Sequence, residues 1–317
     1  MKELSKKSFE EIQLWMYRNA RPLELAIWQY EFENGSKEKV LAALSKYQNE
    51  DGGFGNALEP DCWNPNSSPY TTLNAIDKLK NIDYSDIEHP IIQGIFKFLE
   101  SGLHSNESGW FFSIPTNNDY PHAPWWNYDP DANEYESVGV SAGIACFILK
   151  YADKNSNIYE KATFIIDKLI GKLSETGKYG DMGVGGYCEL MDTLPKLSLS
   201  NRFDLTYLSD KVRRLVYDSI EKDVSKWSSY GKTPSSFILS PESLYYKDNE
   251  ELLLKELDYI IEKRPENGVW GITWSWFENN EIYSKEFAIA ENWWKADIAI
   301  GKLKLLRSFG RLESVLQ

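Results

Sequence analysis

The sequence is poor in the residues that sulfur-based and imidazole-based sites need. It contains 3 cysteines and 3 histidines in 317 residues. The cysteines, Cys62, Cys146 and Cys188, are odd in number, and no pair has metal-ligand spacing. This argues against a disulfide framework and against a zinc ribbon. We therefore expect no metal and no cofactor.

Basic residues are also scarce relative to acidic ones. The chain has 35 Lys and Arg against 48 Asp and Glu, a net charge of −13. Nucleic acids and anionic membranes both select a basic footprint, so neither is an expected partner. The same charge disfavours substrates that carry a diphosphate, unless local cations compensate. The expected ligand is an apolar or sugar-like small molecule.

Long hydrophobic runs are missing. No stretch approaches the roughly 18 apolar residues of a membrane helix, and the longest candidate, residues 138–149, is interrupted by Gly139 and Gly143. The first residues are polar and lack the apolar core of a signal peptide. We expect no membrane span, a cytoplasmic location and no obligate protein partner. Glycine destabilises a helix interior, so we expect Gly139 and Gly143 to allow close helix packing.

Aromatic residues, in contrast, are abundant at 14% of the chain, and apolar residues recur at helical spacing along most of it. No convincing run alternates like a strand, and residues 268–277 fit either a short hairpin or an extended loop. The sequence therefore predicts an all-α fold. The predicted helices are residues 9–16, 22–34, 37–48, 70–80, 90–101, 135–152, 158–173, 205–220, 248–263 and 287–308.

Turns rich in acidic residues, glycine and aromatics separate these helices. The clearest is residues 48–55 (QNEDGGFG), with related turns at 107–111 and 266–271 and a degenerate copy at 180–187. Each of the three clear turns is followed by a loop and then a helix. A repeated unit of this kind is typical of stacked or circular helical hairpins.

Residues 48–55 resemble the QW-type repeat of the terpenoid cyclase and protein prenyltransferase superfamily. Residues 64–72 resemble the Pro-Ser stretch that leads into an inner barrel helix in that superfamily, and the likeness extends over about residues 36–152 and 248–308. The resemblance implies one α/α toroid domain over residues 1–317. Inner helices would line a central cavity, outer helices would surround them, and the long Gly/Pro/aromatic loops would gather at one end.

The resemblance also implies where a catalytic acid would lie. Class II cyclases protonate their substrate with the middle Asp of an Asp-x-Asp-Asp motif, and alignment on Ser137 puts Tyr135 at that position. A shifted alignment uses residues 129–132 and keeps two of the three aspartates, so the motif is degenerate in either alignment. Neighbouring acids then become the candidates for acid catalysis. The candidate catalytic residues are Asp131, Glu134 and Glu136.

The superfamily's metal signatures are incomplete. The Asp-Asp-x-x-Asp cluster that binds Mg²⁺-diphosphate does not occur in the sequence. Cys188 and Asp192 faintly match the zinc ligands of prenyltransferases, but no histidine follows His122. His122 is the best candidate for a functional histidine, and a loop histidine with satisfied hydrogen bonds is the alternative. His89 precedes Pro90 at an expected helix start, and its expected role is to cap that helix or to lie on the surface.

Tryptophans and acids share the loops after the turns, where Glu59 and Asp61 also lie. Aromatic rings can stabilise a carbocation by cation–π attraction, and rings beside two acids about 5–10 Å apart can serve a sugar site. The alternative is that the tryptophans fix the loops and the acids cap helices. The predicted substrate-binding residues are Trp63, Trp110, His122, Trp125, Trp126, Tyr135, Trp270, Trp274, Glu291 and Trp293.

Three functions stay open at this level. The leading hypothesis is a toroid enzyme of the cyclase type that acts on an apolar, isoprenoid-like substrate by acid catalysis. The second is a carbohydrate-active toroid, a glycosidase or lyase with paired carboxylates, which predicts a wet and acidic site. The third is a scaffold that has lost its chemistry.

Overall fold

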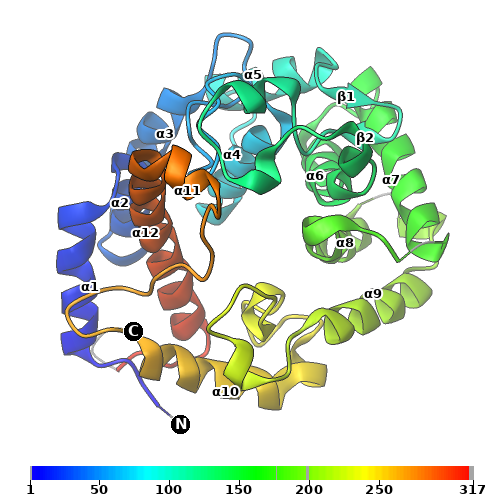
Figure 1. The fold of residues 1–317 in the computed structure, drawn as a ribbon. Helices are drawn as coiled ribbons and strands as arrows, with labels where there is room; N and C mark the ends of the chain where they lie inside the picture. The colour runs from blue at the N-terminus through cyan, green and yellow to red at the C-terminus, as the bar shows by residue number, and fades with distance from the viewer. Residues whose placement is uncertain (1, 176, 198–199, 314–317) are drawn as a thin grey trace. The chain divides into compact units, whose positions relative to one another are not determined.

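The computed structural model describes residues 2–175, 177–197 and 200–313. These residues are mostly helical, with twelve α-helices and one small sheet of two strands (Figure 1). The prediction of an all-α fold is confirmed. None of the helices in the described ranges has the length and apolar character that crossing a bilayer requires.

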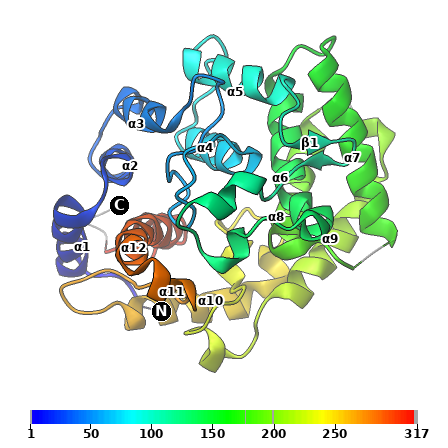
Figure 2. The ribbon, with the colours of Figure 1, turned by 45° about the horizontal axis from the view of Figure 1, so that its top comes forward.

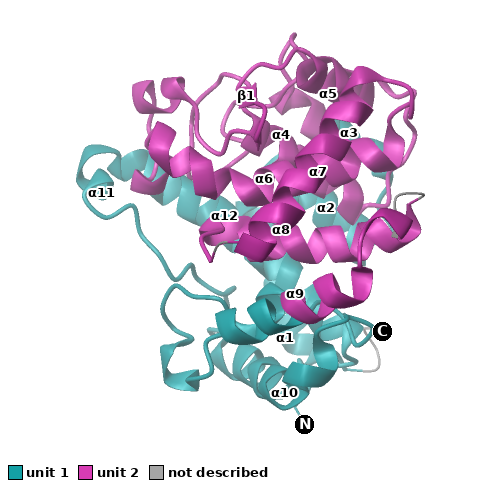
Figure 3. Ribbon diagram, turned by 90° about the vertical axis from the view of Figure 1, so that its right-hand side faces the viewer, with its two compact units in different colours: residues 1–43, 213–317 teal, residues 44–212 magenta. Residues whose placement is uncertain are grey.

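The chain forms two compact units, residues 1–43 with 213–317 and residues 44–212 (Figure 3). Two helices run across the unit boundaries, α3 (Lys37–Leu44) and α9 (Leu205–Ser219). The first unit contains α1 (Lys6–Asn19), α2 (Pro22–Phe32), α10 (Tyr246–Lys263), α11 (Asn279–Ile282) and α12 (Ser284–Ser308). The second contains α4 (Pro69–Asn81), α5 (Pro90–Glu100), α6 (Pro130–Tyr151), α7 (Asn157–Glu175), α8 (Gly180–Thr193), β1 (Ser105–Asn106) and β2 (Gly109–Trp110).

Three helices of the second unit begin with the same local device. Each has proline at its first position, where the missing N–H has no intrahelical partner to lose. The preceding side chains of Ser68, His89 and Asp129 each accept a hydrogen bond from a backbone N–H of the first turn. The predicted capping role of His89 is therefore confirmed. Because Asp129 caps α6, this helix begins at Pro130 and not near residue 135.

In the first unit, α1 packs against α2 and α12, and Figure 2 shows the three helices side by side. Ile12 and Met16 of α1 and Trp28 of α2 are fully buried. The Trp28 ring lies 5.4 Å from Phe9 and 4.7 Å from Phe32, measured between centroids. These aromatic contacts add to the stabilisation that burial of the rings provides.

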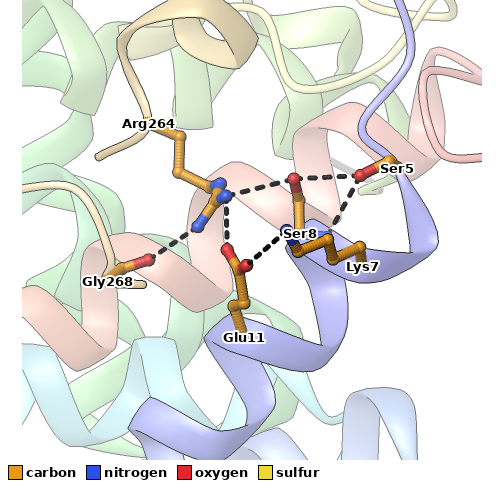
Figure 4. A network of polar contacts seen from close by, with 6 residues as sticks. All are labelled: Ser5, Lys7, Ser8, Glu11, Arg264 and Gly268. Carbon is orange, nitrogen blue, oxygen red and sulfur yellow. Dashed lines mark hydrogen bonds and ion pairs between the residues drawn. The ribbon is translucent and has the colours of Figure 1, made fainter. Parts of the chain in front are cut away.

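Arg264 ties α1 to the turn that follows α10 (Figure 4). Its guanidinium donates to the Gly268 carbonyl at 3.1 Å, to Ser8 Oγ at 3.1 Å and to Glu11 Oε2 at 2.7 Å. The hydrogen bond from Arg264 lowers the pKa of Glu11. The planar guanidinium thus joins the turn at 266–271 to the first helix by several bonds at once.

In the second unit, α6 packs against α4, α7, α8 and β2. A Cβ atom on Gly139 would lie 2.5 Å from Met182 Cβ, and one on Gly143 would lie 2.7 Å from Leu73 Cδ1. Real Cβ atoms do not approach this closely, so both glycines allow close helix packing, as predicted. A Cβ atom on Gly186 of α8 would likewise lie 2.8 Å from the Cα atom of Gly139.

The structure corrects one sequence prediction and adds one helix. Residues 180–187 were predicted to form a degenerate glycine turn, and this is wrong, because they begin helix α8. Gly180, Gly183 and Gly186 lie against α6, whereas a Cβ on Gly185 would meet nothing within 4 Å. The short helix α11 was not predicted. Residues 268–277 form a loop, which is one of the two predicted possibilities.

Candidate functional site

The glycine turn at residues 48–55 docks on α5 and sets the path of the following loop. Gln48 Nε2 donates to the Gly52 carbonyl and to the Ile91 carbonyl, both at 2.9 Å. Gly52 has φ +92°, and a Cβ there would lie 2.0 Å from the Gly94 carbonyl oxygen. Only glycine fits this position. The chain can therefore pass close to α5 before it enters residues 56–68.

This loop buries two carboxylates. Glu59 and Asp61 are each 2% exposed. Glu59 accepts a hydrogen bond from Asn74 Nδ2 at 3.1 Å and one from the Asp61 backbone N–H at 3.4 Å. Asn64 Nδ2 donates to Asn117 Oδ1 at 2.9 Å and joins this loop to the next one. Buried charge requires such hydrogen bonds, because the carboxylates have lost their hydration.

A stripe of polar side chains on α6 fixes the segment that runs from β2 to residue 113. Asn133, Ser137 and Ser141 recur every four residues, so they share one face of the helix. Their side chains accept hydrogen bonds at 2.9 Å from the backbone N–H groups of residues 113, 112 and 110 respectively. The segment after β2 is thereby fixed along α6, and Phe112 points toward the rings described next.

Tyr70, Phe112 and Trp126 form an aromatic cluster. The Phe112 and Trp126 rings stack with 4.6 Å between centroids and 17° between planes. Tyr70 meets Trp126 edge-on at 4.3 Å and Phe112 at 5.5 Å. Trp126 is 3% exposed, and its indole N–H has no hydrogen-bond acceptor among the described residues. A buried donor without a partner costs about 1–3 kcal/mol.

The half-buried Tyr70 hydroxyl lies in a strongly negative environment. Burial, followed by the charges of Glu59, Asp77, Asp61 and Asp181, raises the pKa of Tyr70 well above its ordinary value. The phenol therefore keeps its proton at neutral pH. No hydrogen bond joins its hydroxyl to another residue of the described ranges.

We name this group the acidic–aromatic site. Helix α4 supplies three of its members at positions i, i+4 and i+7, which lie on one helix face. The loop after the first glycine turn supplies two acids, and the start of α8 supplies another. The site comprises Glu59, Asp61, Tyr70, Asn74, Asp77, Phe112, Trp126 and Asp181.

One lysine borders the site. Lys80 Nζ donates to Asp77 Oδ1 at 3.0 Å and to Glu189 Oε1 at 2.6 Å, which links α4 to α8. Burial opposes the charge on Lys80, but the carboxylates of Asp77 and Glu189 outweigh it and raise the pKa of Lys80. For Glu189 the balance is reversed, because burial raises its pKa more than Lys80 lowers it.

We expect Lys80→Met to lower the free energy of unfolding by about 1–2 kcal/mol, since two neighbouring carboxylates lose their shared counter-ion. The side chain is 36% exposed, so solvent screening keeps the effect below that of a fully buried pair. Urea unfolding measures it. The matched control is Lys255→Met, which removes one exposed pair with Glu251 and should change stability by less than about 0.5 kcal/mol. Equal effects of the two variants would contradict the bridging role of Lys80.

The predicted catalytic acids lie on the first turns of α6. Asp131 and Glu134 are exposed, and Tyr135 beside them is 38% exposed. Glu136 Oε2 accepts a hydrogen bond at 3.0 Å from the backbone N–H of Asp181. Glu136 therefore holds the start of α8, next to the acidic–aromatic site. The catalytic roles of these acids stay predictions.

Of the predicted binding residues in the second unit, the structure brings Trp126 into the acidic–aromatic site. Trp63 Nε1 donates to the Pro60 carbonyl at 3.0 Å, within the loop that carries Glu59 and Asp61. Trp125 is 37% exposed. Trp110 is fully buried beneath Lys161, whose Nζ lies 5.0 Å from the ring centroid.

His122 has both ring nitrogens engaged. Nδ1 lies 2.6 Å from the Tyr120 carbonyl oxygen, and Nε2 lies 2.7 Å from Asn127 Oδ1. The side chain is 5% exposed. This arrangement matches the alternative of a loop histidine whose hydrogen bonds are satisfied.

The remaining predicted residues belong to the first unit. Trp270 is buried and donates to the Ile260 carbonyl at 2.8 Å. Trp274 meets a neighbouring tryptophan edge-on at 5.3 Å, and Glu291 pairs with a lysine of α12 at 2.8 Å. Trp293 lies under the Arg21 guanidinium, whose Cζ is 4.7 Å from the ring centroid. In the first unit these side chains contact protein groups, and their predicted ligand roles stay untested.

Five members of the acidic–aromatic site were not predicted, namely Tyr70, Asn74, Asp77, Phe112 and Asp181. A search of the described residues finds no group of three or more His, Cys, Asp and Glu side chains that could hold a metal ion. The function must be inferred from the arrangement of these side chains, because no protein-family model matches the chain and no curated protein is significantly similar to it.

Proposed function

We propose that the chain is an α/α toroid protein of the kind its glycine turns resemble, and that it binds a neutral hydroxylated molecule, a sugar or polyol, at the acidic–aromatic site. One observation carries this proposal. The Tyr70 hydroxyl makes no hydrogen bond to another described residue, and the charges of four carboxylates add to burial in raising its pKa. Carboxylates from the same set would act as acid and base on the bound molecule.

The chemistry of the site suits a ligand that both donates and accepts hydrogen bonds. An ionised carboxylate accepts hydrogen bonds and donates none, so the carboxylates of the site match the donating O–H groups of a polyol. The Tyr70 hydroxyl keeps its proton and can donate to a ligand oxygen. The stacked rings of Phe112 and Trp126 offer an apolar face beside these polar groups. Small-molecule sites commonly combine apolar walls with a few placed polar groups.

An isoprenoid ligand fits the site less well. It would remove water from the carboxylates around Tyr70 without offering them hydrogen bonds, which is unfavourable. The isoprenoid hypothesis stays as the second candidate for two reasons. The docked turn at Gln48 and Gly52 is the segment that resembles the cyclase superfamily, and the nearby rings could stabilise a cation.

A glycoside-cleaving reaction would need two of the carboxylates as proton donor and base. In known glycosidases such a pair lies about 5–10 Å apart. Glu59 and Asp77 contribute the largest negative fields at the Tyr70 hydroxyl, after burial. We therefore propose these two as the proton donor and the base.

Titration with neutral saccharides tests this proposal. We expect tryptophan fluorescence to show saturable binding of cellobiose, maltose or chitobiose, and we expect Tyr70→Phe to weaken it about tenfold, the effect of one lost hydrogen bond of about 1.4 kcal/mol. The substitution should leave stability unchanged, because it removes no protein hydrogen bond. Tyr207→Phe is the matched control, since Tyr207 is 53% exposed on α9.

Each other outcome counts against the proposal. Binding of farnesol in place of the saccharides would favour the isoprenoid hypothesis. Saccharide binding that Tyr70→Phe leaves unchanged would place the ligand elsewhere. Binding of neither class would leave the scaffold hypothesis.

A further inference from the structure

The first unit contains an amine in an unusual setting. Lys302 is half-buried on α12, where its neighbours Ala299, Leu303 and Leu306 are buried apolar residues. Its Nζ lies 5.2 Å from the centroid of the Trp270 ring. Trp270 is itself fixed by its hydrogen bond to the Ile260 carbonyl. Within the described ranges, no hydrogen bond or ion pair engages the Lys302 amine.

The carboxylate whose charge acts on Lys302 is that of Glu256, and it is hydrogen-bonded to other groups. Glu256 is 3% exposed and accepts hydrogen bonds from Ser235, at 2.7 Å from the backbone N–H and 2.6 Å from Oγ. Burial lowers the pKa of Lys302 to about 8, although the charge of Glu256 raises it in part. Burial also raises the pKa of Glu256. Neither group is therefore held in its charged form by a direct pair.

Two other lysines of α12 are engaged in ordinary ion pairs. Lys295 Nζ lies 2.8 Å from Glu291 Oε1, and Lys304 is paired with Glu31. Their side chains are 29% and 30% exposed. They lie on the same helix as Lys302 and are also partly buried, so they serve as its controls. At pH 7 an amine with pKa about 8 is roughly one-tenth neutral, against about one part in 2,500 for an ordinary lysine. A desolvated neutral amine is the nucleophile that forms Schiff bases.

We propose that Lys302 is a carbonyl-reactive site that condenses with small uncharged aldehydes and ketones. The amine nitrogen attacks the carbonyl carbon, a C=N bond forms, and the carbonyl oxygen leaves as water with the two amine protons. The charge of Glu256 disfavours anionic compounds such as 2-oxo acids. This site is independent of the acidic–aromatic site, which belongs to the other unit.

Reductive trapping tests the proposal on the intact protein. The protein is treated at pH 7 with propanal and sodium cyanoborohydride, and peptide mass spectrometry follows propylation of each lysine over time. We expect Lys302 to react at least tenfold faster than Lys295 and Lys304. With glyoxylate as the aldehyde, this preference should fall several-fold. Glu256→Gln should increase the Lys302 rate with propanal, because it removes the charge that favours the ammonium form.

Controls separate local folding from sequence effects. The preference should vanish in urea-unfolded protein, and Lys302→Arg should remove the fast-reacting peptide while Lys295 and Lys304 react as before. Equal rates for the three lysines in the folded protein would overturn the proposal. So would a preference for Lys302 that persists after unfolding.

Discussion

Replacement of Gly52 by alanine is expected to lower the free energy of unfolding by about 3 kcal/mol or more. Two effects add. The residue has φ +92°, which costs a non-glycine residue roughly 1–2 kcal/mol. In addition, the new methyl group would lie 2.0 Å from the Gly94 carbonyl oxygen, a backbone atom that cannot rotate away. Overpacking of this kind typically costs about 1–3 kcal/mol.

Gly171 is the matched control for this experiment. It lies in the interior of α7, and a Cβ there would meet nothing within 4 Å. Gly171→Ala should raise the free energy of unfolding by about 0.5–1 kcal/mol, because alanine favours the helix. If the turn at Gly52 lies as close to α5 as in the structure, urea unfolding will show that the two substitutions change the free energy of unfolding in opposite directions. Two small changes of the same sign would contradict that geometry.

The consequence of Gly52→Ala reaches beyond stability. The turn at residues 48–55 directs the loop that buries Glu59 and Asp61, and these acids shape the environment of Tyr70. A displaced turn would therefore also weaken ligand binding at the acidic–aromatic site. Gly52→Ala is for this reason a poor probe of the site itself, and Tyr70→Phe is the better one.

Most helices could be predicted because their signals are local. Apolar periodicity and the caps at Ser68, His89 and Asp129 lie within a few residues of the helices they define. Helix α8 could not be predicted in this way. Glycine has low helix propensity, and contacts with α6, such as that between Gly186 and Gly139, show why glycines occur in this helix.

The site was predictable in part. Tyr70, Asn74 and Asp77 share one face of a predicted helix, so their spacing alone could have grouped them. Trp126 was predicted as a binding residue, and it does lie beside Tyr70. The approach of Asp181 could not be read from spacing, because it depends on the packing of α8 against α6. The hydrogen bond from Asp181 N–H to Glu136 records that packing.

The buried pair of Arg21 and Glu24 gives the second large effect. Arg21 Nε lies 2.6 Å from Glu24 Oε2, and Nη2 lies 3.0 Å from Oε1, with 5% and 1% of the two side chains exposed. Arg21→Met would leave the Glu24 carboxylate buried without its counter-ion. We expect the free energy of unfolding to fall by about 3–5 kcal/mol, measured by urea unfolding.

The double variant separates the pair from its surroundings. Arg21→Met with Glu24→Leu removes both charges and should recover at least half of the loss, since apolar residues can replace a buried pair at little cost. Arg213→Met is the control, because its pair with Asp248 is about one-third exposed on both sides and should contribute only about 0–1 kcal/mol. A double variant no more stable than Arg21→Met would show that the loss does not arise from the unpaired carboxylate. The Arg21 guanidinium also lies over the Trp293 ring, with its Cζ 4.7 Å from the ring centroid. This cation–π contact holds the guanidinium in place, so Trp293→Leu should reduce the stabilisation that the Arg21–Glu24 pair provides.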